Sequence, residues 1–217
     1  MSDDIWPVVH AERRALAADL ANLTPEQWAT PSLCTGWSVH DVLAHMVATA
    51  KETPPRFLVG MLTSGFRLSR MTEKRIAEER AGGPAATLAA FRGVETATSA
   101  PPGPKLSWLG EALVHAEDIR RPLGIAHDYP LASVTQVTDF YASSNVLIGG
   151  KNRVAGVTLQ ATDADWSHGS GPVVSGPARA LMLATTGPLP RDQSVSVACR
   201  VTPATRLLPP ISTFELA

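Results

Sequence analysis

The sequence predicts an α+β fold in which an N-terminal four-helix bundle is followed by a small C-terminal α/β domain. Through the first half of the chain, apolar residues recur at the spacing of amphipathic helices. Segments rich in proline and glycine separate these stretches, as expected for an antiparallel bundle. After about residue 127 the pattern changes to short alternating stretches typical of strands. We therefore expect two domains, residues 1–127 and residues 128–217.

Four stretches are the predicted bundle helices: residues 4–22, 38–50, 83–94 and 106–121. The second has the clearest start, because Ser38 followed three residues later by Asp41 resembles a capping box. The fourth is the best defined and is stopped by Pro122 and Gly124. Between the bundle helices we expect a short helical turn at residues 24–27 and further helix within residues 56–80.

The C-terminal part mixes helix and strand patterns. Residues 131–148 and 177–186 predict helices, and residues 163–171, rich in Asp, Ser and Gly, predict a turn. Strands are expected at residues 156–162, 172–175 and 194–201. These elements together predict a compact α/β unit.

Composition excludes several classes of protein. The 217 residues include 19 basic and 20 acidic side chains, so no net charge draws the chain to nucleic acid or to an anionic membrane. The local basic cluster Arg67, Arg70, Lys74 and Arg75 is interleaved with Glu73, and we interpret it as a solvated helix face. No apolar stretch is long enough to span a bilayer. We expect no nucleic-acid or membrane partner, and a monomer or homodimer.

Cysteine usage points to the cytoplasm. Cys34 and Cys199 are far apart, and the N-terminus does not resemble a signal peptide, so a disulfide framework is not expected. Two cysteines cannot build a thiolate zinc site, and any metal would therefore use histidine and carboxylate ligands.

Three residues form a candidate metal site. Glu111 and His115 are four apart on the best-defined helix and so share one face, while His45 lies at the edge of the apolar stripe of the second helix. Two imidazoles and one carboxylate suit a divalent metal such as zinc and leave positions open for water or substrate. Spacing alone also fits an ordinary surface Glu–His pair and a boundary histidine whose hydrogen bonds are satisfied.

Asp118 falls near the same line of the helix, three residues after His115. It fits a catalytic role, orienting a metal ligand or handling a proton, and equally a surface acid paired with Arg121. Cys34 is expected to pack as a small apolar residue. The remaining histidines lack a partner at ligand spacing and are interpreted as surface or loop residues: His10, His40, His127 and His168.

Two motifs carry a family resemblance. Residues 23–45 (LTPEQWATPSLCTGWSVHDVLAH) resemble the opening of the mycothiol-dependent maleylpyruvate isomerase family, part of the DinB-like superfamily. Residues 110–124 (GEALVHAEDIRRPLG) resemble the Glu-x-x-x-His helix of that family, and residues 156–166 match its C-terminal region more loosely. The resemblance covers about residues 8–187.

The resemblance implies a DinB-like bundle and a sterol-carrier-like C-terminal domain. It also implies that His45, Glu111 and His115 bind zinc or a similar divalent ion, whose open position receives the thiolate of mycothiol as a cosubstrate. In the family an arginine of the C-terminal domain reaches the active site. Arg179 and Arg200 are candidates for it by region only.

The implied activity is that of a mycothiol-dependent metalloenzyme acting on a small electrophilic substrate, with the metal-bound thiolate as nucleophile. A cis–trans isomerase would add the thiolate to a double bond, allow rotation and release it, whereas a thiol S-transferase would release the conjugate. Two alternatives remain open. One is a metal-dependent hydrolase that uses no thiol, with Asp118 or Asp41 as general base. The other is a non-catalytic metal- or ligand-binding stress-response module.

Overall fold

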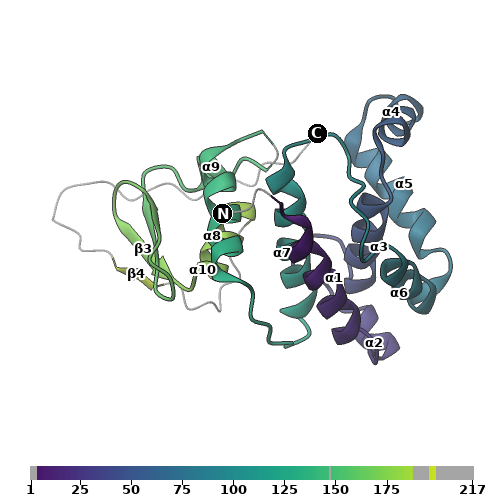
Figure 1. The fold of residues 1–217 in the computed structure, drawn as a ribbon, viewed down its shortest axis with the longest axis horizontal. Helices are drawn as coiled ribbons and strands as arrows, with labels where there is room; N and C mark the ends of the chain where they lie inside the picture. The colour runs from purple at the N-terminus through teal and green to yellow at the C-terminus, as the bar shows by residue number, and fades with distance from the viewer. Residues whose placement is uncertain (1–3, 147, 188–195, 199–217) are drawn as a thin grey trace.

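In a computed structural model, residues 4–146, 148–187 and 196–198 are described, and they form an α+β fold, as predicted (Figure 1). Along the longest axis of the molecule, the N-terminal helices occupy one end and the sheet the other, with α8 and α10 between them. Within this described part, no helix has the length and apolar character needed to cross a membrane.

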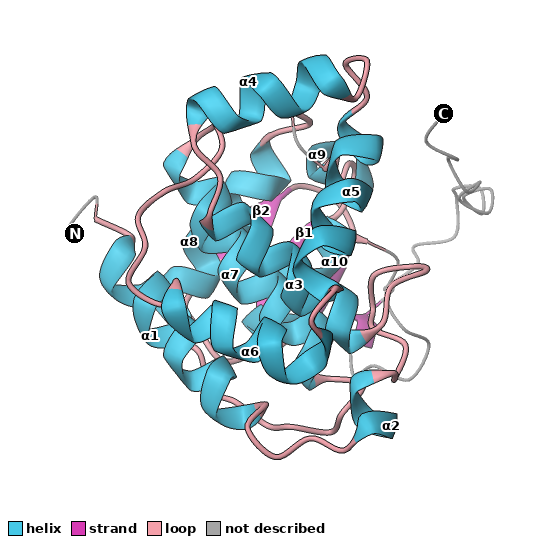
Figure 2. Cartoon of the chain, turned by 90° about the vertical axis from the view of Figure 1, so that its right-hand side faces the viewer, coloured by secondary structure: helices cyan, strands magenta, loops and turns pink. Residues whose placement is uncertain are grey.

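The N-terminal part is entirely helical apart from its loops (Figure 2). Its helices are α1 (Trp6–Asp19), α2 (Pro25–Trp28), α3 (Val39–Ala50), α4 (Pro54–Thr63), α5 (Leu68–Arg80), α6 (Gly83–Gly93) and α7 (Lys105–Arg120). Helix α3 packs against α5, α6 and α7, and α1 packs against α6 and α7. Fully buried apolar side chains such as Val9, Leu43, Phe91 and Leu113 join these helices into one core, whose burial is the main stabilising contribution.

The predicted start of α3 is confirmed. The Ser38 hydroxyl accepts a hydrogen bond from the Asp41 amide (3.2 Å), and the Asp41 carboxylate accepts one from the Ser38 amide (2.8 Å). This reciprocal pair satisfies amides that would otherwise lack partners at the helix end. It also fixes where the helix that carries His45 begins.

Residues 56–80 are helical, as expected, but they form two helices that are separated by a turn. Gly65 (φ 64°) and Phe66 (φ 60°) both adopt left-handed backbone conformations after α4. The Phe66 amide donates to the Met61 carbonyl (2.8 Å), which closes the end of α4. Helix α5 then leaves in a new direction.

The C-terminal part contains α8 (Leu131–Ser143), α9 (Gly150–Arg153), β1 (Thr158–Ala161), β2 (Ser167–Gly169), β3 (Val173–Gly176), α10 (Ala178–Thr186) and β4 (Ser196–Ala198). The strands form a mixed sheet in the order β2-β1-β3-β4, with β1 parallel to β3 and the other pairs antiparallel. A second apolar cluster, which includes Leu159 and Leu181, joins the sheet to the helices around it.

Two details of this region differ from the prediction. The helix expected over residues 131–148 ends at Ser143. The turn expected over residues 163–171 contains strand β2, in which His168 pairs with Leu159 of β1. The Asp, Ser and Gly residues around β2 are typical of turns and conceal a strand of three residues. Of the predicted strand at 194–201, residues 196–198 are described and form β4, and the other residues lie outside the described part.

Candidate metal centre

Packing of α3 on α7 brings His45 and His115 together. Their ring centroids are 4.9 Å apart and their planes are almost perpendicular (87°). On its other side His45 contacts the Trp37 ring, with centroids 5.2 Å apart. The two imidazoles that the sequence placed on separate helices therefore lie in direct contact.

Hydrogen bonding fixes the orientation of His115. Its Nδ1 lies 2.9 Å from Asp118 Oδ2, and because an ionised carboxylate only accepts, Nδ1 carries the proton. Burial alone lowers the pKa of His115, but the hydrogen bonds to Asp118 and Cys34 and the charge of Asp118 more than offset this and raise it well above its ordinary value. Nε2 remains as the nitrogen available to another partner.

Asp118 is a buried residue, so its interpretation as a surface acid is wrong. The residue is only 6% exposed, and Oδ2 accepts from both His115 and Cys34. In the sequence, the signal for the contact with His115 was the position of Asp118 three residues later, on the same face of α7.

Cys34 does more than pack as an apolar residue. It contacts the core, but its Sγ also lies 3.1 Å from Asp118 Oδ2 and 3.8 Å from His115 Nδ1. Burial raises the pKa of the thiol, so Cys34 keeps its proton and donates it to Asp118. The loop that carries Cys34 is joined to α7 a second time, through the Leu33 amide and the Asp118 carbonyl (3.2 Å).

Glu111 lies one helical turn before His115 and is half-buried. Its Oε1 is buried and has no hydrogen-bond partner among the described residues. Burial raises the pKa of the carboxyl, although the charges of His115 and Arg13 partly offset this effect. Arg13 does not satisfy it, since its guanidinium donates to the Val94 and Ala97 carbonyls (3.1 and 2.8 Å).

The site is closed on the α8 side by a tight contact. A Cβ placed on Gly110 would lie 2.2 Å from the Tyr141 hydroxyl oxygen, so residue 110 has no room for a side chain. The Glu111 charge in turn contributes to a raised pKa of Tyr141, after burial as the main cause.

The described residues contain one group of potential ligands whose donor atoms all lie within 4.8 Å of one another: Cys34, His115 and Asp118. His45 and Glu111 do not belong to this tight group. His45 contacts the His115 ring from outside this group.

Other candidates from the sequence have their own partners. His40 is buried, contrary to the prediction of a surface residue, and its Nε2 lies 2.8 Å from the Thr87 hydroxyl. His127 pairs with Glu12, and His168 with Asp139. Asp41 caps α3 and pairs with Arg80.

One buried cluster was not predicted at all. Arg120 is fully buried, and its Nε donates to Asp19 (2.7 Å) while Nη1 donates to the Tyr129 hydroxyl (2.9 Å). Glu12 lies 3.5 Å from Nη1 and also accepts from His127. Asp19 and Glu12 are far from Arg120 in sequence, and no local pattern could have indicated them.

A cavity of about 400 Å³ lies where the segment after α7 meets α10. Among its lining residues is Arg179, which pairs with Glu117 (3.5 Å) and donates to the His127 carbonyl (3.2 Å). None of the three predicted metal ligands lines this cavity. The other arginine considered, Arg200, lies outside the described residues.

The family model of the mycothiol maleylpyruvate isomerase N-terminal domain matches residues 9–120, slightly more than half of the sequence. The chain belongs to the mycothiol maleylpyruvate isomerase family. The family segment contains all three predicted ligands and Asp118, and the predicted family resemblance is confirmed.

Two solved structures share the fold of this family member. They are crystal structures of mycothiol-dependent maleylpyruvate isomerase and of a histidine-to-alanine mutant of it, at 16% and 15% sequence identity. Each alignment has a TM-score of 0.54 and covers 82% of this chain and 85% of the other. Among curated proteins, no match to the chain was found.

Proposed function

We propose that this family member is a mycothiol-dependent metalloenzyme in which His45, Glu111 and His115 bind one divalent ion, most simply zinc. The observation that carries the proposal is the contact between the two imidazole rings, with Nδ1 of His115 already held by Asp118. A histidine that ligates a metal through one nitrogen commonly donates its other N–H to a carboxylate. His115 has this arrangement before any metal is considered.

The states of His45 and Glu111 also fit a cation. Burial and the His115 charge lower the pKa of His45 to about 3, so its lone pair is available at neutral pH. Glu111 is a buried carboxyl with an unpartnered oxygen, which is costly unless a cation or a donor satisfies it. A divalent ion between these groups would supply that partner.

When bound, the metal would lower the pKa of a coordinated thiol and so supply a thiolate at neutral pH. The residues of the chain would hold this centre in place. Asp118 would keep the proton on Nδ1 of His115, and Trp37 would cover one side of His45 and exclude water from it.

We further propose that the thiolate attacks a small electrophile. The two solved relatives are described as maleylpyruvate isomerases, and cis–trans isomerisation of a related compound is the reaction we favour. The sulfur would form a bond to one carbon of the cis double bond, and rotation about the resulting single bond would follow. Breaking the same C–S bond would restore the double bond and regenerate the thiolate. A thiol S-transferase would end at the adduct.

The second donor set, Cys34, His115 and Asp118, is better explained as support for the centre. The protons of Cys34 and His115 both point to the same oxygen, Asp118 Oδ2, which describes a hydrogen-bonded cluster. The raised pKa of Cys34 also favours a protonated thiol over a thiolate ligand. Cobalt substitution separates the two sets, because only a cysteine ligand gives a sulfur-to-metal charge-transfer band that Cys34→Ser abolishes.

A thiol-independent hydrolase is less well supported. It needs a free general base, yet Asp41 is engaged with Ser38 and Arg80, and Asp118 with His115 and Cys34.

The experiment is metal analysis of the purified full-length protein and three variants. We expect stoichiometric metal in the wild type and in the control His168→Ala, and its loss in His45→Ala and His115→Ala. His168 is a suitable control because it lies on β2 and pairs with Asp139. A metal-free wild type, or metal retained by both ligand variants, would contradict the metal site.

Titration with mycothiol then tests the second half of the proposal. We expect binding by the metal-loaded wild type, and turnover of maleylpyruvate only when the thiol is present. Metal without thiol binding would contradict mycothiol dependence, and a stable conjugate in place of the trans isomer would identify a transferase.

A further inference from the structure

The corner between α4 and α5 exposes an unusual number of apolar side chains. Five large apolar residues within eleven positions are each more than half exposed: Leu58, Val59, Leu62, Phe66 and Leu68. Elsewhere in the described chain, only Leu131 and Val146 are large apolar residues with comparable exposure. Leu58 and Leu62 are four apart on α4 and share a face. We call these five residues the α4–α5 corner.

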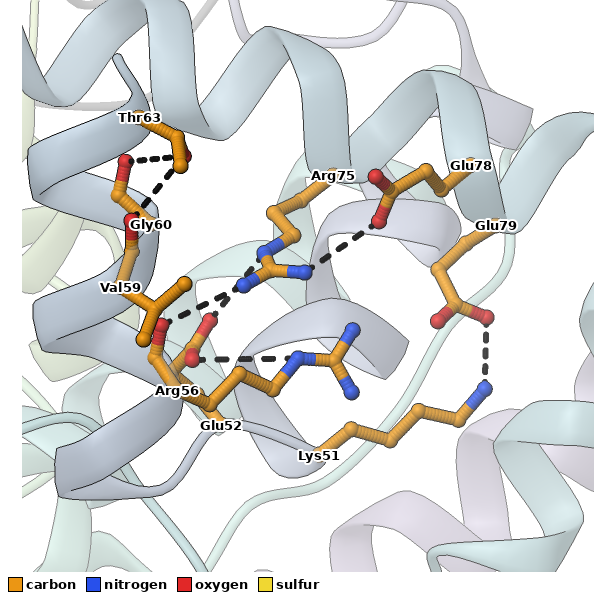
Figure 3. Close-up of polar contacts among 9 residues, drawn as sticks. All are labelled: Lys51, Glu52, Arg56, Val59, Gly60, Thr63, Arg75, Glu78 and Glu79. Atoms are coloured by element: carbon orange, nitrogen blue, oxygen red, sulfur yellow. Dashed lines mark hydrogen bonds and ion pairs between the residues drawn. The ribbon is translucent and has the colours of Figure 1, made fainter. Parts of the chain in front are cut away.

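Figure 3 shows polar contacts that join α4 and α5 to each other and to the end of α3. Buried Glu52 pairs with Arg56 (3.9 Å) and Arg75 (3.6 Å), and Arg75 also donates to the Arg56 carbonyl (3.4 Å). Lys51 at the end of α3 pairs with Glu79 (2.7 Å). These contacts attach α4 and α5 to the bundle without using the exposed apolar side chains.

Phe66 is unfavourable for the fold in two respects. Its backbone has a φ of 60°, which is rare and costly for a bulky side chain, and its ring is 69% exposed. Asparagine or glycine would serve the turn better. A residue that strains the backbone in order to present an aromatic ring to solvent is a candidate for an interaction.

Basic side chains surround the apolar ones. Arg67, Arg70 and Lys74 are exposed, and the structure shows no ion pair for them with the described residues. Residues 54–74 contain four basic residues and a single acidic one, Glu73. The balanced charge of the whole chain conceals this local excess.

From these observations we infer that the α4–α5 corner docks on an anionic phospholipid surface. Phe66 and the leucines would enter the boundary between headgroups and acyl chains, while Arg67, Arg70 and Lys74 would contact lipid phosphates, as in amphipathic elements that lie in a membrane interface. A second copy of the chain is a poorer partner, because a symmetric contact would bring the same basic residues together. The inference does not depend on the proposed metal chemistry.

Co-sedimentation of the full-length protein with vesicles tests the inference. We expect binding to vesicles of equal parts phosphatidylcholine and phosphatidylglycerol, little binding to phosphatidylcholine alone, and weaker binding as salt rises. Phe66→Asn should lower the partition coefficient about tenfold, because a buried aromatic ring is lost. Asparagine also tolerates the left-handed backbone, so the variant should fold, which its melting curve would verify.

Charge is tested by a matched pair of triple variants. Replacing Arg67, Arg70 and Lys74 with Gln should lower the partition coefficient about fivefold for each charge removed. The control replaces Arg14, Lys105 and Lys151 with Gln, which changes the net charge equally at exposed positions elsewhere. Val146→Ser is the corresponding control for Phe66→Asn, and both controls should bind like the wild type.

Several results would overturn the inference. They are no binding to anionic vesicles, equal losses in the control and corner variants, and full binding by folded Phe66→Asn. A dimer in solution that Phe66→Asn dissociates would show that the corner is instead covered by a second copy.

Discussion

Helix α7 carries two buried polar clusters that differ in how far the protein satisfies them. Arg120 is fully buried, but Asp19, Tyr129 and Glu12 surround its guanidinium and leave only Nη2 without a partner among the described residues. Glu111, nine positions earlier, therefore projects from the opposite side of the helix. Its Oε1 has no hydrogen-bond partner in the described structure.

This difference indicates that the two clusters have different roles. A buried charge with several partners can be explained by the fold alone, because its desolvation is offset within the protein. A carboxyl with a buried, unpartnered oxygen, one helical turn from His115, is explained better by a ligand that the protein alone does not supply. The comparison predicts that changes at Arg120 alter stability, whereas changes around His115 alter metal binding.

The largest effect is expected at Arg120. Arg120→Ala leaves Glu12 and Asp19 without their cation and should lower the free energy of unfolding by about 3–5 kcal/mol. Urea denaturation measures the loss, and Arg14→Ala, at an exposed position of α1, should change it by less than about 0.5 kcal/mol. Folded Arg120→Ala should retain the metal content of the wild type. A stable variant that loses its metal would reverse the two assignments.

Metal removal is expected to have the next largest effect. A ligand that binds only the folded state at about 100 times its Kd stabilises it by about 2.7 kcal/mol. A chelator should therefore lower the Tm of the wild type and leave that of His115→Ala unchanged. If the chelator lowers the Tm of both proteins equally, it acts elsewhere. The proposed difference between the Arg120 and Glu111 clusters would then be wrong.

Asp118 should tune the metal without binding it. Asp118→Asn removes the acceptor charge that holds His115 Nδ1–H and should weaken metal affinity about 10- to 100-fold. A competition titration with a chromophoric chelator measures this change. Asp139→Asn is the matched control, because Asp139 holds His168 at an exposed position. Equal metal affinities of Asp118→Asn and the wild type would show that Asp118 does not support metal binding.

The stability of the metal-free protein is also expected to depend on pH. Unfolded His45 takes up a proton near pH 6.5, whereas in the folded state its pKa is lowered to about 3. The unfolded state thus binds more protons between these values, and the contribution of His45 lowers stability as pH falls through this range. His115 acts in the opposite sense, because its folded pKa is raised and its contribution is lost as pH rises.

His45→Gln isolates the first of these contributions. We expect the metal-free variant to gain stability relative to the metal-free wild type as pH is lowered below about 6.5. Denaturation of both proteins across this pH range is the measurement, with His168→Gln as control. A constant difference between variant and wild type would show that the burial of His45 does not control its protonation.

Much of the local structure could be predicted from the sequence because its causes are local. The Ser38–Asp41 capping box and the stop of α7 at Pro122 depend on residues within a few positions of each other. The spacing of Glu111 and His115 likewise fixed their common face. The strand β2 was missed because three residues rich in turn formers give too little pattern.

Contacts between distant residues had no such signal. Arg120 and Asp19 are 101 positions apart, and Cys34 and Asp118 are 84 apart, so neither pair follows from any spacing rule. The family motifs identified His45 as a candidate ligand. They did not show that Cys34 donates a hydrogen bond to the Asp118 carboxylate. Only the packing of α3 and its preceding loop on α7 does so.

The glycine at position 110 restricts how this protein can evolve. Gly110 leaves no space between α7 and the Tyr141 ring of α8. Even one methyl group at residue 110 would therefore push α7 and α8 apart. The C-terminal half of the chain is therefore fitted to this particular N-terminal half. A C-terminal region exchanged for a new one would have to supply a side chain that fits against Gly110 as Tyr141 does.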